Sequence, residues 1–212
     1  MIQNIKPEEI EARSFELIEQ ELEARGIRLE PDRAPVIRRA IHTSADFEYA
    51  ETLVFSDEAV RIARELLRNG ADIVTDTNMA LAGIHKKKLA QYGGEARCYM
   101  ADEEVAREAK ERGVTRASVS MERAAEDILA SGRKTIFAIG NAPTALVTLH
   151  TMMNYGIFRP DFIIGVPVGF VNVTEAKELI LSSDVPHIVN RGRKGGSTIA
   201  AAIVNALLAG EE

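Results

Sequence analysis

The chain has 212 residues, of which 46% are hydrophobic, and a formal net charge of −6 at pH 7. A chain of this length can bury about 70% of its unfolded surface, so we predict a single domain over residues 1–212, and the negative charge argues against a nucleic-acid partner, which would need clustered lysine and arginine. No apolar run approaches the ~20 residues of a membrane span and the single Cys98 indicates a reducing compartment, so we expect a cytoplasmic protein without a membrane partner.

Helices open the chain, and an alternation of strands and helices follows. Pro7 at the first helical position and Gly26 at the end bound an N-terminal helix, and a shorter helix is predicted from Pro35 to about Ile41. Short apolar runs then predict strands at 52–55, 72–76, 95–100, 134–140, 161–165 and 186–190. Helical patterns follow most of these runs, including 102–112 and 116–131.

Strands that are apolar almost throughout and separated by helices indicate a parallel sheet with both faces covered. We therefore predict an α/β fold with a doubly wound, mainly parallel sheet, helices on both faces and an N-terminal helical extension. In such sheets ligands bind beyond the carboxyl ends of the strands. Four segments follow predicted strands there: "TDTNMA" (75–80), "GNAPTAL" (140–146), "GVPVGFVNVTEAKE" (165–178) and "NRGRKGGS" (190–197).

The segment 140–146 has the composition of a helix entry that binds an anion. Gly140 allows a tight turn, Asn141 can cap the helix, and Pro143 suits the first helical turn. The free N–H groups would then face the ligand crevice, ready for a carboxylate or phosphate. The alternative is an ordinary strand-to-helix turn.

The segment 165–178 has a similar composition. Gly165 and Gly169 would let the backbone approach a ligand closely, and Asn172 with Glu175 resembles a helix start. The alternative is a long connection stiffened by Pro167.

The segment 190–197 places Arg191, Arg193 and Lys194 beside glycines at a helix entry, which predicts an anion clamp. It is not a Walker A loop, because Lys194 precedes the glycines, and no G-x-G-x-x-G follows a strand. An NAD- or phosphate-dependent enzyme is therefore disfavoured. The small-residue run 199–209 favours close-packed core or a subunit contact.

His42 is the candidate general acid/base, because imidazole can give and take a proton near neutral pH. Arg39 would lie one turn earlier on the same side, and Asp46 could orient the ring if the helix continues. The alternative is a surface or capping histidine.

The other histidines and the cysteine have plainer interpretations. We expect His85 to face solvent, His150 and His187 to be packed, and Cys98 to be a buried core thiol in a strand. The histidines are far apart and no CxxC or HExxH pattern is present, so we expect no protein-bound metal.

Taken together, these segments resemble the precorrin-8X methylmutases and their cobalt-precorrin-8 counterparts in cobalamin biosynthesis. The resemblance covers nearly the whole chain and is carried by residues 12–18, 36–42, 73–84, 113–118, 138–146, 165–178 and 191–207. One departure stands out: many members have Thr-Arg-Ser-Ala-Ala-Ala where this chain has Thr-Arg-Ala-Ser-Val-Ser at 115–120.

The resemblance implies an intramolecular isomerase that moves a methyl group between adjacent carbons of ring C of a tetrapyrrole, giving hydrogenobyrinic or cobyrinic acid. It places the catalytic histidine at His42. Substrate contacts fall on Ser14, Arg39 and Arg116, and the backbone around Asn141 to Thr144 is expected to contribute. It also implies a homodimer without a separate cofactor, in which any cobalt belongs to the substrate. A non-catalytic corrinoid carrier is the alternative function.

Overall fold

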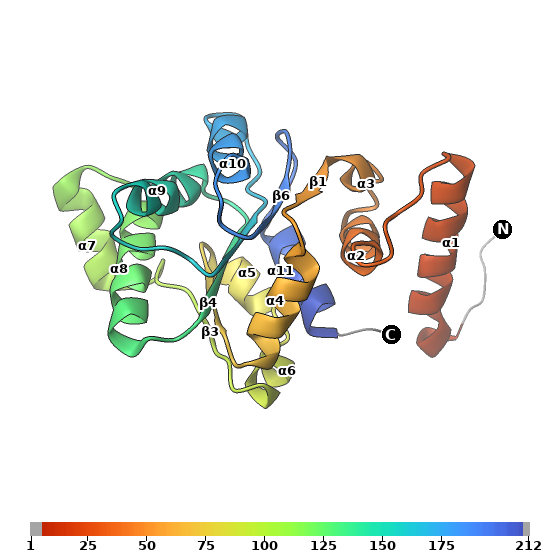
Figure 1. The fold of residues 1–212 in the computed structure, drawn as a ribbon, viewed down its shortest axis with the longest axis horizontal. Coiled ribbons are helices and arrows are strands. Elements are labelled where there is room, and N and C mark those ends of the chain that lie inside the picture. Colours follow the sequence, from red (N-terminus) through yellow and green to blue (C-terminus); the bar gives the residue numbers. More distant parts are fainter. Residues whose placement is uncertain (1–5, 210–212) are drawn as a thin grey trace.

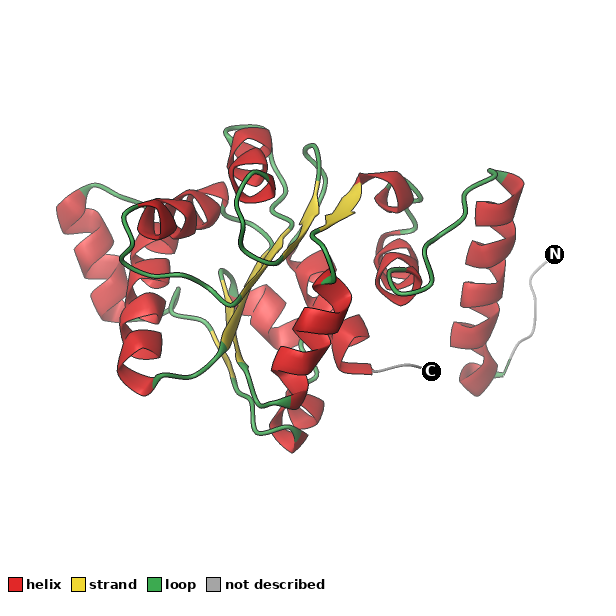
Figure 2. Ribbon diagram, in the orientation of Figure 1, coloured by secondary structure: helices red, strands yellow, loops and turns green. Residues whose placement is uncertain are grey.

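The computed structural model describes residues 6–209, and in this part of the chain helices flank both faces of one six-stranded sheet (Figures 1 and 2). The strand order is β1-β6-β5-β4-β2-β3. The strands are β1 Leu53–Phe55, β2 Asp72–Thr75, β3 Ala96–Arg97, β4 Thr135–Ile139, β5 Phe162–Gly165 and β6 His187–Asn190. The pairs β2–β3, β2–β4, β4–β5 and β5–β6 are parallel and β1–β6 is antiparallel, which confirms the mainly parallel sheet.

Alternate residues of each central strand pack against different helices, as the pleat requires. In β4, Ile136 and Ala138 belong to the core under one set of helices, and Phe137 and Ile139 to the core on the other face. The first face carries α1 Ile10–Ala24, α2 Ala34–Ser44, α3 Tyr49–Thr52, α4 Ala59–Arg68, α5 Asn78–Gly83, α6 Lys86–Gln91 and α11 Ser197–Ala209. The second carries α8 Arg116–Ser131, α9 Pro143–Asn154 and α10 Val173–Leu181, with α7 Glu103–Arg112 packed outside α8.

Helix α11 is the central helix of the first face and positions α2 and α5. Its residues from 199 to 208 are buried except for the half-buried Asn205, so this part of the run 199–209 is core, one of the two roles predicted for it. A Cβ on Gly83 would lie 2.8 Å from the Ala201 Cβ, so α5 and α11 pack too closely for any other residue at position 83. Among residues 6–209, no helix combines the length and apolarity that crossing a membrane requires.

The structure differs from the sequence-based expectations at the sheet edges. The strand expected over 95–100 is only Ala96–Arg97, because it pairs with β2 alone. Cys98 therefore lies just beyond the strand and is half-buried, so the expected core thiol is wrong. Helices α3, α5 and α6 were not predicted, since each has six residues or fewer and too short a run to establish a helical period.

His187 is buried in β6, as expected, and is a pH-sensitive point of the sheet. Its Nδ1 lies 2.8 Å from the Val185 carbonyl oxygen, to which it can donate, and burial lowers its pKa. The unfolded chain therefore binds a proton at higher pH than the folded one. At pH values below about 6.5 we therefore expect the free energy of unfolding to decrease, and this group contributes at most about 1.4 kcal/mol per pH unit. Urea unfolding between pH 7 and 5.5 should show a shallower pH dependence for His187→Gln; an unchanged slope would contradict this assignment.

Candidate active site

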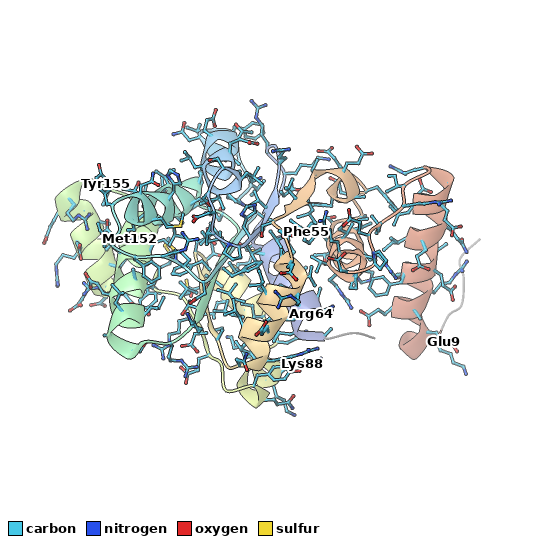
Figure 3. All side chains as sticks on the ribbon, in the orientation of Figure 1. Glu9, Phe55, Arg64, Lys88, Met152 and Tyr155 are labelled. Atoms are coloured by element: carbon cyan, nitrogen blue, oxygen red, sulfur yellow. The ribbon has the colours of Figure 1, made fainter. Side chains whose placement is uncertain are left out.

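The residues predicted for the site fall into two groups. The first group consists of Ser14 on α1 and of Arg39 and His42 on α2. The second group lies where two other helices begin: Asn141 and Thr144 at the start of α9, and Arg116 at the start of α8. Figure 1 is drawn with the long axis horizontal and places α1 at one end of the molecule and α7 and α8 toward the other. Glu9, before α1, and Tyr155, after α9, are labelled in Figure 3 and lie toward opposite ends of the molecule.

The first group is arranged around the ring of Phe15. The His42 imidazole stacks on this ring with 5.1 Å between centroids and an interplanar angle of 27°. The Arg39 guanidinium lies 4.9 Å from the same centroid and forms an ion pair with Glu11. Arg39 and His42 are thus on one side of α2, as their spacing of three residues predicts. His42 is exposed and lies in the last turn of the helix, where a proton donor can reach a ligand.

Ser14 and Arg39 connect this group to neighbouring features. The Ser14 hydroxyl donates to the Ile10 carbonyl oxygen at 2.8 Å, so its position is fixed by its own helix. Arg39 also lines a cavity of about 490 Å³ between α2, α5 and α11, together with Thr43, Met79 and Thr198. The cavity provides room for part of a ligand beside the Phe15 cluster.

The prediction that Asp46 orients His42 is wrong. Helix α2 ends at Ser44, and Ala45 adopts a left-handed conformation with φ of 54° that turns the chain away. The Asp46 carboxylate instead accepts a hydrogen bond from the Lys194 ammonium at 2.6 Å, which holds the pKa of Asp46 below its usual value. Lys194 also pairs with Glu48 at 2.7 Å and so ties the end of α2 to the loop after β6.

The second group is joined by hydroxyl groups at two helix starts. Thr115 caps α8 by accepting from the Ser118 N–H at 3.1 Å, and its Oγ1 lies 2.9 Å from Thr144 Oγ1. Arg116, the first residue of α8, is exposed and has no ion-pair or hydrogen-bond partner within residues 6–209. A cation without an internal partner therefore lies beside these two helix starts.

The turn before α9 corrects another expectation. Pro143 is at the first helical turn as predicted, but Ala142 is the N-cap residue and the Asn141 side chain does not cap the helix. The N–H groups of Gly140, Asn141 and Ala142 do not await an external anion, because all three donate to the Asp76 carboxylate, at 2.8, 2.8 and 2.6 Å. Asp76 is fully buried; burial raises its pKa and the three donors oppose that rise.

In the anion clamp predicted at 190–197, the three cationic side chains have partners within the protein. Arg191 pairs with Glu178, Arg193 lies over the Phe170 ring, and Lys194 binds Asp46. This loop is held in place by Lys177, which was not singled out from the sequence. Lys177 is fully buried, donates to the carbonyl oxygens of residues 192 and 194 at 2.7 and 2.8 Å, and has its pKa lowered by burial to about 8.

The segment 165–178 is shaped by its glycines rather than by a capping box. Asn172 has φ of 56° and makes no side-chain cap, so the predicted Asn172–Glu175 helix start is wrong in that detail. Phe170 is 83% exposed and Val171 76% exposed, which is unusual for large apolar side chains side by side. The loop after β5 therefore presents an apolar surface next to the Arg193 guanidinium.

The remaining chemistry is sparse. His85 is exposed, as expected, and His150 is half-buried. Within the described residues no three His, Cys, Asp or Glu side chains are grouped as metal ligands would be. The site can thus offer an imidazole on an aromatic ring, guanidinium groups and hydroxyls, which suit binding of an anionic ligand and proton transfer to it.

Comparison with known proteins gives a consistent result along the chain. The family model described as precorrin-8X methylmutase matches residues 9–210. A cobalt-precorrin-8 methylmutase of Salmonella typhimurium is 42% identical over 208 residues, covering 96% of this chain and 95% of the relative. That of Priestia megaterium is 41% identical over 203 residues, covering 96% and 88%.

A solved structure shares the fold. The precorrin-8x methyl mutase of Thermus thermophilus superposes with a TM-score of 0.83 at 38% identity, covering 95% of this chain and 96% of that one. At this identity and coverage the likeness extends to the sequence as well as to the arrangement of helices and strands.

Proposed function

The chain belongs to the precorrin-8X methylmutase family, and from this premise we propose that it moves a methyl group between adjacent carbons of ring C of precorrin-8 or cobalt-precorrin-8. The product would be hydrogenobyrinate or cobyrinate in cobalamin biosynthesis. The observation that carries the proposal is the similarity along residues 9–210, which includes both groups of the candidate site.

His42 would act as the general acid/base. It would protonate the substrate near ring C, so that the ring draws electrons as the methyl moves, and then take a proton back from the isomer. One carbon–carbon bond breaks as the neighbouring one forms, and no atom is gained or lost. Its exposed position and its stacking on Phe15 support this role, because they hold the imidazole in one orientation and leave it open to a ligand.

The substrate is a flat, apolar macrocycle with carboxylates around its edge, and the proposed contacts match this chemistry. Arg39 and Arg116 would pair with carboxylates, and Asn141 and Thr144 would donate hydrogen bonds. The Ser14 hydroxyl would donate to the substrate in place of the Ile10 carbonyl oxygen that it binds here. No separate cofactor is proposed, and cobalt would enter as part of the substrate.

We also propose a cytoplasmic homodimer. In such a dimer the Arg116 group of one chain would complete the His42 group of the other. Sedimentation of the purified protein tests the oligomeric state.

The direct test is incubation of the purified protein with metal-free and with cobalt-loaded substrate, followed by absorbance and mass. An isomerase changes the absorbance and leaves the mass unchanged. Stoichiometric binding without any spectral conversion of either substrate would instead identify a corrinoid carrier and overturn the proposal.

Arg116→Ala should weaken substrate binding because a charge-assisted contact to a carboxylate is lost. A hydrogen bond to a charged group contributes about 1.5–3 kcal/mol, so the dissociation constant should rise about 10- to 100-fold at low salt, and less at high salt. The matched control is Arg107→Ala, which removes an exposed arginine from α7. Equal affinities of the Arg116 variant and the unmodified protein at low salt would remove Arg116 from the site.

A further inference from the structure

Asp76 is a buried carboxylate with an unusual set of partners. It follows β2 directly, and its side chain crosses to the end of the neighbouring strand β4. One carboxylate oxygen, Oδ1, accepts from Gly140 N–H at 2.8 Å, and the other, Oδ2, accepts from Asn141 and Ala142 at 2.8 and 2.6 Å. Asp76 is completely buried, and these three hydrogen bonds of its carboxylate all go to the turn at 140–142.

These contacts put Asp76 where a bound anion would otherwise be. N–H groups at the start of a helix converge on negative charge, and here α9 begins at Pro143, immediately after the three donors. The chain therefore supplies its own carboxylate to this position. A carboxylate of the substrate has to bind elsewhere, at the free Arg116 or at side chains of the turn.

The turn that Asp76 holds is continuous with the second group of site residues. Asn141 is bound through its own N–H, and Thr144 lies three residues further on. Thr144 in turn contacts Thr115, which precedes Arg116. Three residues proposed to bind the substrate are thus connected to one buried carboxylate by hydrogen bonds and short chain segments.

We propose that Asp76 is a positioning residue for substrate binding, which fixes the 140–142 turn and with it the placement of Asn141, Thr144 and Arg116. This inference rests on the proposed function, since it takes those residues as substrate contacts. Asp76 touches no substrate and moves no proton in this scheme. Its role is to bind the N–H groups before α9 with a fixed carboxylate, so that neither solvent nor ligand has to bind them.

The test replaces the carboxylate and then restores it with a small anion. Asp76→Gly leaves a cavity against the three N–H groups, and we expect its dissociation constant for precorrin-8 to rise about 10-fold or more, as for loss of a charged hydrogen-bonding group. Formate fits this cavity and should lower the dissociation constant again, whereas chloride at equal ionic strength should not. Asp76→Asn should bind equally weakly and gain nothing from formate, because its side chain fills the space.

A matched control separates positioning from general stability. Asp161 accepts the Thr135 N–H at 3.0 Å and pairs with Lys134 at 2.7 Å at the opposite end of β4, so Asp161→Gly removes a hydrogen-bonded carboxylate away from the turn. We expect it to lower stability and leave the dissociation constant unchanged. If Asp76→Gly fails to fold without formate, the Asn variant supplies the affinity measurement. Unchanged affinity in a folded Asp76 variant would overturn the proposal.

A second measurement is independent of turnover. Amide resonances of residues 140–142 should shift in Asp76→Gly and return toward their original positions with formate. Binding is measured separately from conversion, so an unmodified protein that binds precorrin-8 without isomerising it would contradict the proposed function and leave the role of Asp76 intact. Resonances that do not respond to formate would contradict the role of Asp76 alone.

Discussion

Replacing His42 with alanine is expected to reduce turnover of precorrin-8 by about 10²- to 10⁴-fold, the usual contribution of a general acid/base. The proposed migration needs a proton delivered to the ring C region and removed afterwards. Within the first group of site residues, His42 is the side chain suited to both steps, since Arg39 is permanently charged and paired with Glu11. Substrate binding should survive, because the proposed carboxylate contacts lie on other residues.

The measurement should separate proton transfer from packing, because His42 also covers the Phe15 ring. His42→Phe keeps an aromatic ring in that position and removes the proton-transfer group, so it should be as inactive as His42→Ala. His150→Gln, on α9, is the control and should turn over normally. Full conversion by His42→Phe would remove His42 from the mechanism.

The sheet could be predicted because its strands are apolar along their whole length. Residues such as Ile136 to Ile139 are buried on both faces, and this pattern is visible without knowing any partner. The direction of β1 was not predictable in the same way. It pairs antiparallel with β6, the last strand of the chain, and it carries only three residues, so no local pattern indicates its direction.

The placement of Arg39 and His42 on one side of α2 followed from helical spacing, and their common partner Phe15 did not. Polar partners were the least predictable feature. Lys194 and Asp46 are 148 positions apart, and Asp76 reaches N–H groups more than 60 positions away. Such pairs depend on which strand ends are neighbours, so a lysine or aspartate that looks available in the sequence can be occupied in the fold.

Lys177 is the clearest case of a residue that sequence patterns conceal. It lies on α10 within a segment that looks like an ordinary amphipathic helix, and it is completely buried. A buried ammonium is costly unless it is hydrogen-bonded, and its donors here satisfy carbonyl groups of the 191–194 loop. Asp76 and Lys177 both lie within predicted strand-end segments, 75–80 and 165–178, so an acid or lysine inside such a segment is the signal that would have selected them.

Gly195→Ala is expected to cause the largest loss of stability among substitutions in the strand-end loops. A Cβ at this position would lie 2.1 Å from the Val166 carbonyl oxygen and 2.9 Å from that of Pro167. Both contacts are with backbone, so no side-chain rotation can relieve them. The same Val166 oxygen accepts the Gly196 N–H at 2.9 Å, and displacing it would break the bond that joins the loops after β5 and β6.

The expected loss is about 3 kcal/mol, at the upper end for overpacking a close contact, which corresponds to a fall in Tm of about 6–12 °C for a chain of this size. Gly192→Ala is the matched control in the same loop: its φ is +77° and no atom lies within 4 Å of the added Cβ, so only the conformational cost of about 1 kcal/mol applies. Thermal unfolding followed by circular dichroism compares the two. Equal losses would mean that the close approach of Gly195 to Val166 does not determine how these loops pack, and that backbone conformation alone sets their sensitivity.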